Sequence, residues 1–291
     1  MSPLVYWQLD VFAERPLAGN GVAVFPDASR LTPAAMQALT HELRQFESIF
    51  LLPDSEPQVQ GARIFTLEEE LPFAGHPILG AAALLHHLQD HQTTDAEWTL
   101  QLAAKSVRLL TRRQERGFYA QMDQGVAEFA AQLDPIQAQV IAEAFGLSGA
   151  QLDRRYPATV VSTGLPYLIL PITAQGLAQA KQQRTLDAEL ASHGAAFVFL
   201  LDVDNREGRT WDPFGVIEDI ATGSAAGPVA AFLVEHGLHR RGEPFSLNQG
   251  RFLGRPSRLD VCQGSDGRVN VGGNVQLVAC AKLLVDPRDL A

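Results

Sequence analysis

The chain has 291 residues, enough to bury a sizeable core in one large or two modest domains. Its formal net charge of −10 argues against nucleic acid and anionic membrane surfaces as partners, although a local pocket can still attract a small anion. No apolar run approaches the roughly 18 residues that span a bilayer, the N-terminus has no signal-peptide features, and the two cysteines lack metal-site spacing. We therefore expect a cytoplasmic protein with no metal site.

The first half of the chain alternates strands with one amphipathic helix. Residues 5–12 and 22–25 are predicted strands, separated by a glycine-containing loop. Thr32 and Pro33 form a helix start, and apolar residues then recur at helical spacing as far as Phe46. Residues 49–52 are apolar on both faces, which predicts a buried strand.

The second half repeats this order of elements. Residues 159–162 and 167–170 are predicted strands, residues 177–191 a helix, and residues 196–201 a buried strand that matches 49–52. Further strands are expected at 98–102, 107–110, 119–122, 258–262 and 269–271. The order indicates two closely packed α+β halves.

Each half then reaches a glycine-bearing turn that opens an apolar helix. The first half has Arg63, then Glu70, then Gly75, and a helix over residues 78–88. The second has Arg209, then Glu218, then Gly223, and a helix over residues 225–235. Both helices are apolar nearly all round, so both should be buried.

The two helix starts are candidate anion sites. Pro77 and Pro228 are both predicted to lie in the opening turn, where a missing N–H costs little. Gly75 and Gly223 precede them, and unpaired N–H groups with the helix dipole favour a carboxylate or a developing oxyanion. The alternative is that each glycine only permits a tight strand-to-helix turn.

A polar residue follows each turn glycine. The helix dipole should keep His76 neutral, so that it can polarise a carbonyl or relay a proton. Ser224 takes the same place in the second half, and Asp219 is positioned to orient a substrate amine or the histidine. A lone histidine is also common in cores and on surfaces, and Asp219 can equally be a solvated turn carboxylate.

Glu47 lies where the amphipathic helix ends and the buried strand begins. A carboxylate at this place should be partly desolvated, which suits it to proton transfer. Ala196 holds the matching place in the second half when counted from the apolar strands, so only one half carries a base. Glu47 can alternatively cap a neighbouring backbone group.

Five ordered motifs resemble the PhzF-like family of phenazine-biosynthesis proteins. They contain Asp10 with Gly19 and Asn20, Glu47 with Ser48, Phe73 to Pro77, Glu218 to Ala225, and Gln249-Gly250 with Gly254-Arg255. The resemblance implies a fold like that of diaminopimelate epimerase, an α+β protein with two pseudo-symmetric halves, each a barrel-like sheet around a central helix. The halves are expected at residues 1–115, completed by strands at about 268–288, and at residues 116–267.

The resemblance also implies roles for particular residues. Glu47 corresponds to the proton-shuttling glutamate, with His76 and Asp219 as its catalytic supports. Substrate contacts are expected from Asn20, Gly75, Gly223 and Ser224. Related two-base racemases carry cysteines before the turn glycines, whereas this chain has Ala74 and Thr222 there, so inversion by a thiol pair is not expected.

The sequence therefore predicts a cofactor-free isomerase that moves a proton on a small amino- or hydroxy-carboxylic acid. Its site is expected between the two halves, its partner is a small anionic metabolite, and the family resemblance implies a homodimer. A non-catalytic small-anion binding module is the first alternative. A hydrolase or lyase using Ser224 or His76 is the second, although no third triad group is evident.

Overall fold

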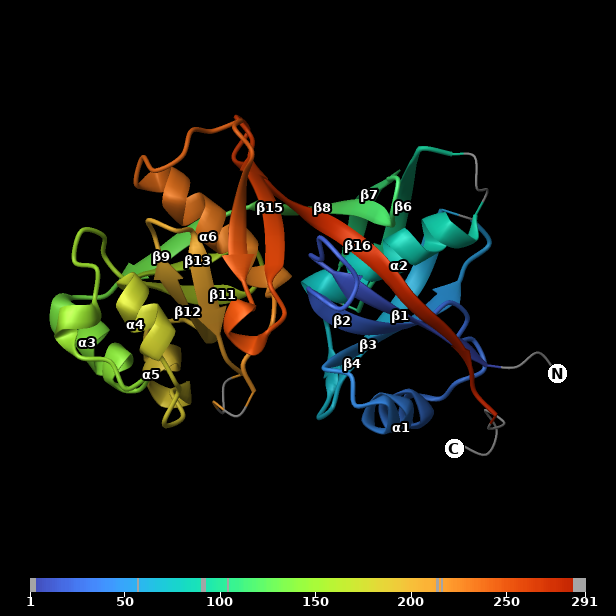
Figure 1. Ribbon diagram of the computed structural model, residues 1–291, viewed down its shortest axis with the longest axis horizontal. Coiled ribbons are helices and arrows are strands. Elements are labelled where there is room, and N and C mark those ends of the chain that lie inside the picture. The colour runs from blue at the N-terminus through green and yellow to red at the C-terminus, as the bar shows by residue number, and fades with distance from the viewer. Residues whose placement is uncertain are drawn as a thin grey trace. The chain divides into compact units, whose positions relative to one another are not determined.

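The computed structural model describes residues 4–56, 58–89, 93–103, 105–212, 215 and 217–284, and its elements are shown in Figure 1. The protein has a mixed α+β fold that divides into two units. Unit 1 consists of residues 1–123 and 272–291, and unit 2 is Gln124–Val271. Of the strand region expected at 268–288, residues 285–288 lie outside the described part of the chain.

The strands of unit 1 follow one another in a path that returns to its start. Their order is β1-β2-β3-β4-β6-β7-β8-β16, and β16 pairs with β1 again, so that the last strand of the chain completes the sheet. β2 with β3 and β4 with β6 are parallel pairs. The bounds are β1 Val5–Val11, β2 Asn20–Phe25, β3 Glu47–Pro53, β4 Val59–Thr66, β5 Glu70–Leu71, β6 Asp95–Gln101, β7 Ser106–Arg113, β8 Phe118–Val126 and β16 Arg268–Lys282, the last two crossing the unit boundary.

Two helices pack on opposite faces of this sheet. Helix α2 (Gly75–Leu88) contacts β1, β2, β3, β6 and β7, and its sides are buried nearly all round, as its apolar sequence predicts. Helix α1 (Pro33–Leu43) begins at Thr32, whose side chain accepts from the Ala35 N–H, and it covers an aromatic layer containing Phe25, Phe50 and Phe65.

Side-chain alternation along β2 and β3 decides which residues meet α2. Ala23 and Phe50 point into the layer beneath α1. Val22 points to the opposite face, toward α2. Its contact with Gly80 of that helix shows this, since a Cβ added to Gly80 would lie 2.9 Å from Val22 Cγ1. Val22 is paired with Glu47 across the parallel strands, so Glu47 faces α2 as well.

Unit 2 has strands in the order β15-β14-β13-β12-β11-β10-β9. Helix α6 (Gly223–Glu235) contacts β10, β11 and β15. Helices α3 (Pro135–Glu143), α4 (Ala174–Gln179) and α5 (Asp187–Ser192) are labelled in Figure 1, and they contribute residues to a separate apolar cluster. The strand bounds are β9 Glu128–Gln132, β10 Thr159–Ser162, β11 Pro166–Pro171, β12 Phe197–Asp202, β13 Glu207–Thr210, β14 Phe245–Gln249 and β15 Ser257–Gln263. Short 3-10 turns occupy Gly149–Gln151 and Arg251–Leu253.

The prediction of a single helix over residues 177–191 is wrong, because the chain forms two helices, α4 and α5, with a break between them. Ala180 adopts an extended ψ of 132° at the end of α4. Beyond it, the N–H groups of Lys181 and Gln183 donate to the carbonyls of Phe145 and Ala144. These tertiary hydrogen bonds replace the helical ones, so the apolar periodicity alone did not reveal the break.

The repeated arginine and glutamate form the same ion pair in each unit. Arg63 donates from Nε and Nη2 to the two carboxylate oxygens of Glu70, at 2.7 and 2.5 Å. Arg209 does the same to Glu218, with both distances 2.7 Å. Each guanidinium also lies over the aromatic ring two residues further on, Phe65 or Trp211. The sequence repeat therefore has a local structural counterpart in both units.

Candidate functional site

Three predicted site residues meet at one end of α2 in unit 1. Asn20 is the first residue of β2, Glu47 the first of β3, and His76 the second of α2. His76 Nδ1 lies 3.4 Å from Glu47 Oε2 and 3.4 Å from Asn20 Nδ2. All three residues are at least nine-tenths buried. The fold thus places a carboxylate, an imidazole and an amide in one desolvated cluster.

His76 is neutral in this cluster. Burial lowers its pKa to about 3, and the Gly21 backbone opposes this shift only in part. The sequence analysis expected a neutral histidine because of the helix dipole, whereas desolvation is the dominant cause in the structure. The contact with Glu47 is therefore not a salt bridge: the uncharged ring places Nδ1 3.4 Å from Glu47 Oε2, and Nδ1 accepts from Asn20 Nδ2.

The N-terminus of α2 adds backbone donors to this cluster. Ala74 is the N-cap residue and provides no side-chain hydrogen bond. Gly75 and His76 are the first two helical residues, and their N–H groups have no carbonyl four residues back inside the helix. Pro77, the third residue, has no N–H, as the sequence analysis expected for an opening turn.

In unit 2, Asp219 and Gln249 hold the turn that precedes α6. Thr222, the N-cap residue, donates from Oγ1 to Asp219 Oδ2 at 2.5 Å. Gln249 accepts from the Thr222 N–H at 3.0 Å and donates to the Asp219 carbonyl at 2.9 Å. Asp219 is therefore engaged with Thr222, at the place where related racemases carry cysteine. Its predicted role toward substrate remains a prediction.

The first two residues of α6, Gly223 and Ser224, have side-chain partners from elsewhere in unit 2. Gln124 donates from Nε2 to the Gly223 carbonyl at 2.7 Å. The hydroxyls of Ser224 and Tyr167 lie 2.7 Å apart. The sequence analysis missed Gln124 and Tyr167, since each is more than 50 residues from its partner along the chain.

Pro228 does not lie in the opening turn of α6, so that prediction is wrong. It is the sixth residue of the helix, inside its body. A residue at this position would donate its N–H to the Ser224 carbonyl, and proline has none. The first turn of α6 thus lacks one helical hydrogen bond beside Ser224.

The residue that matches Glu47 in unit 2 is Phe197, rather than Ala196 as the sequence count suggested. The strand register fixes this match. Arg63 pairs with Phe50, and its counterpart Arg209 pairs with Leu200, so Phe50 and Leu200 are equivalent. Glu47 and Phe197 each lie three positions before these residues and are therefore equivalent too. The position is acidic in unit 1 and aromatic in unit 2.

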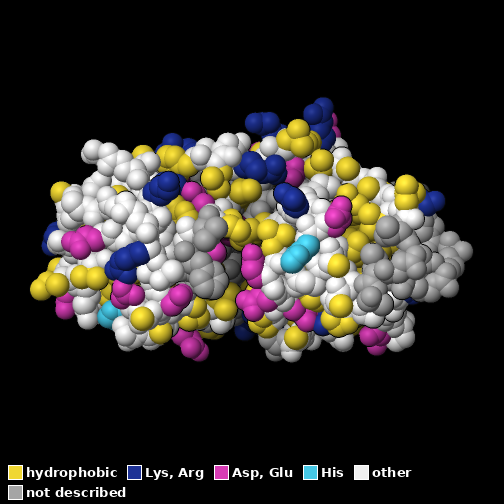
Figure 2. All heavy atoms as spheres, turned by 90° about the horizontal axis from the view of Figure 1, so that it is seen from below, with side chains coloured by type: hydrophobic (Ala, Val, Ile, Leu, Met, Phe, Trp, Pro, Cys, Tyr) yellow, Lys and Arg dark blue, Asp and Glu magenta, His cyan; other side chains and the backbone are white. Residues whose placement is uncertain are grey.

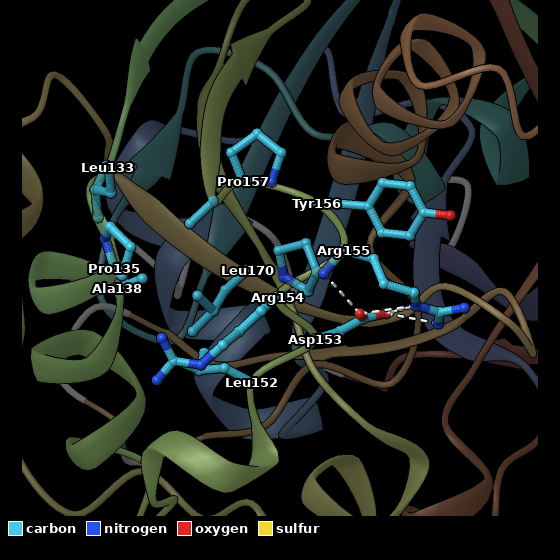
Figure 3. Close-up of a pocket in the computed structure, with 12 residues that line it drawn as sticks. Leu133, Pro135, Ala138, Leu152, Asp153, Arg154, Arg155, Tyr156, Pro157 and Leu170 are labelled. Atoms are coloured by element: carbon cyan, nitrogen blue, oxygen red, sulfur yellow. Dashed lines mark hydrogen bonds and ion pairs between the residues drawn. The ribbon is translucent and has the colours of Figure 1, made fainter.

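None of the predicted catalytic residues lines the pocket drawn in Figure 3. That pocket, in unit 2, has an apolar floor that includes Leu133, Leu152 and Leu170. Its carboxylate, Asp153, is held by Arg155 in an ion pair. We therefore place no chemistry there.

The surface carries side chains of several types. Figure 2 shows acidic, basic and hydrophobic side chains interspersed on one face of the protein. In the described ranges, no cluster of three or more His, Cys, Asp or Glu residues has the geometry to hold a metal ion. Among the described residues, no helix is both long and apolar enough to cross a membrane.

Comparisons with known proteins identify the family. The family model described as phenazine biosynthesis-like protein matches residues 9–280. The trans-2,3-dihydro-3-hydroxyanthranilate isomerase of Pseudomonas fluorescens is 33% identical over 260 residues, covering 87% of this chain and 88% of that protein.

Solved structures agree with this result. A predicted epimerase from Pseudomonas aeruginosa is 65% identical, with a TM-score of 0.94 over 97% of this chain and 100% of that one. A probable proline racemase from Agrobacterium radiobacter, at 13% identity and a TM-score of 0.62 over 98% of this chain and 94% of that one, shares the fold alone. The chain therefore belongs to the phenazine biosynthesis-like family and is an isomerase of the PhzF type.

Proposed function

We propose that this protein moves a proton on a small amino- or hydroxy-carboxylic acid without a cofactor, with Glu47 as the acid and base. The observation that carries the proposal is the buried contact between Glu47 and a neutral His76 at the start of α2. The named activity of the Pseudomonas fluorescens relative supports the substrate class, because that substrate carries carboxylate, amino and hydroxyl groups.

The proton transfer begins with Glu47 ionised. The neutral His76 ring lies beside the carboxylate, with Nδ1 3.4 Å from Glu47 Oε2, and Asn20 Nδ2 donates to the same ring nitrogen. The carboxylate takes a proton from an acidified substrate carbon, and electron density moves toward the substrate's conjugated system. Glu47, now protonated, returns the proton to a different carbon, so that an isomer forms and the carboxylate is restored.

Binding of the substrate anion is assigned to the helix N-termini. The N–H groups of Gly75 and Gly223 and the hydroxyl of Ser224 supply donors to a carboxylate or enolate-like oxygen, and Asp219 attracts the substrate amine. One well-aimed donor of this kind can stabilise a developing oxyanion by roughly 3–4 kcal/mol.

A thiol mechanism has no support in the residues that precede the turn glycines. Cys262 is in β15 and Cys280 is an exposed residue of β16, so neither lies in a glycine turn. We also propose that the protein acts as a cytoplasmic homodimer. A single-chain mass in sedimentation equilibrium would contradict the dimer.

The proposal is tested by incubating the purified protein with trans-2,3-dihydro-3-hydroxyanthranilate and a panel of small amino and hydroxy acids. Proton NMR should show one of them converted to an isomer of the same mass. Recovery of every compound unchanged, with one of them raising the melting temperature, would instead support a binding module. Release of a smaller fragment would support a hydrolase or lyase.

A further inference from the structure

Tyr167 contacts Ser224 in the first turn of α6, and the mechanism above gives this tyrosine no role. This residue of β11 is 3% exposed, and its hydroxyl lies 2.7 Å from Ser224 Oγ. We propose that Tyr167 is a positioning residue that makes Ser224 a donor to the substrate anion. The inference rests on the proposed function, which places an anionic oxygen at the N-terminus of α6.

The direction of the hydrogen bond follows from counting donors. Ser224 and Tyr167 each have one hydroxyl hydrogen. If Ser224 donated to Tyr167, it would present only lone pairs to a bound anion and would repel it. If Tyr167 donates to Ser224, the serine hydrogen is available for the anion. Binding of an anion therefore selects the second arrangement, and the donated bond polarises the serine hydroxyl further.

The neighbouring strand fixes the tyrosine ring for this role. Tyr167 is paired with Phe197 across parallel strands, and the two rings stack with centroids 5.2 Å apart and an interplanar angle of 24°. A stacked, buried ring has little rotational freedom, so its hydroxyl is held at the serine. Removing the oxygen while keeping the ring should therefore leave the packing intact.

The same register shows how the two units differ in chemistry. In unit 1 the paired residues are Val22 and Glu47, and Glu47 contacts His76 on its helix. In unit 2 they are Tyr167 and Phe197, and Tyr167 contacts Ser224. A carboxylate in place of Phe197 would repel a substrate carboxylate. Only unit 1 thus carries a base at this strand position, whereas unit 2 carries the hydroxyl pair of Tyr167 and Ser224.

The test is a double-mutant cycle of Tyr167→Phe and Ser224→Ala, assayed with trans-2,3-dihydro-3-hydroxyanthranilate. Tyr167→Phe should lower kcat/KM about tenfold, mainly through KM if the bond serves substrate binding. In the Ser224→Ala background the same change should have no further effect, because its target is gone. Tyr156→Phe, which removes a hydroxyl elsewhere in unit 2, is the matched control and should keep wild-type constants.

A wild-type kcat/KM in the Tyr167→Phe variant would overturn the proposal. So would an equal loss of kcat/KM when Tyr167→Phe is introduced into the wild type and into the Ser224→Ala variant. Melting curves of each variant check that the fold is retained. Affinity for the stable aromatic analogue 3-hydroxyanthranilate, measured by calorimetry, separates this inference from the proposed function. Weaker binding by Tyr167→Phe supports it even if no substrate is turned over. Unchanged binding overturns it while leaving the Glu47 chemistry intact.

Discussion

At the scale of single residues, the contact between Glu47 and His76 depends on keeping the imidazole uncharged. A protonated His76 would lock Glu47 as a carboxylate in a salt bridge and hinder its return to the acid form. Burial prevents this, because it lowers the pKa of His76 to about 3. The same burial gives the protein a stability that depends on pH.

The sign of this dependence follows from proton binding. The unfolded histidine has a pKa near 6.5, so between about pH 6.5 and 3 the unfolded state binds the extra proton. The free energy of unfolding of unit 1 should therefore fall as the pH is lowered through this range, by up to about 1.4 kcal/mol per pH unit. His76→Gln should remove this component.

Urea unfolding between pH 4 and 7 measures the effect. In a Trp211→Phe background, Trp7 and Trp98 report unit 1, since those are the remaining tryptophans. His193→Gln, the same substitution at a histidine of unit 2, is the control. An identical slope in the His76→Gln protein would show that His76 does not carry the dependence.

Residue-level roles were partly accessible from sequence. Glu47 and His76 were selected because each lies close to the start of a predicted element, and Asn20 was selected from the family resemblance; the structure brings the three together. Tyr167 and Gln124 were not selected, because their roles depend on partners far along the chain. A local pattern does not specify such partners.

At the scale of elements, the first turn of α6 depends on the absence of a side chain at Gly227. A Cβ there would lie 2.1 Å from Gln124 Oε1, and this glutamine donates to the Gly223 carbonyl. Gly227→Ala should therefore displace Gln124 and lower the free energy of unfolding of unit 2 by about 1–3 kcal/mol, despite alanine's better helix propensity.

Denaturant unfolding followed by Trp211 fluorescence measures this cost, since Trp211 is the tryptophan of unit 2. The same substitution in a Gln124→Ala background should be much less costly, because the crowded atom has been removed. Equal costs in both backgrounds would mean that the glycine serves another purpose.

Element boundaries were predictable where local chemistry sets them. Thr32 and Pro33 start α1 as expected. The break between α4 and α5 was missed, because hydrogen bonds to the end of α3 override the helical period. Pro228 was misplaced for a related reason, since the helix start is set by the Asp219–Thr222–Gln249 network and not by proline.

At the scale of the whole molecule, the order of elements along the chain predicted more of the fold than the amino-acid composition did. The repeat of Arg63 with Glu70 and of Arg209 with Glu218 indicated duplication, and the matching ion pairs agree with it. β16 pairs with β1, and the expectation that C-terminal strands complete the first half stays a prediction. A barrel in each half and a shared cleft remain predictions, because neither follows from strand pairing within one unit.

The most direct test of the central claim is deuterium incorporation during turnover in heavy water. The wild-type protein should convert trans-2,3-dihydro-3-hydroxyanthranilate to an isomer, with deuterium at the receiving carbon in those turnovers in which the protonated Glu47 exchanges with solvent before it returns the proton. Glu47→Gln should slow both conversion and incorporation by about 10²- to 10⁴-fold, with its melting temperature maintained. Glu68→Gln, the same change on an exposed turn of unit 1, should match the wild type. Conversion and incorporation at the wild-type rate in Glu47→Gln would contradict the account.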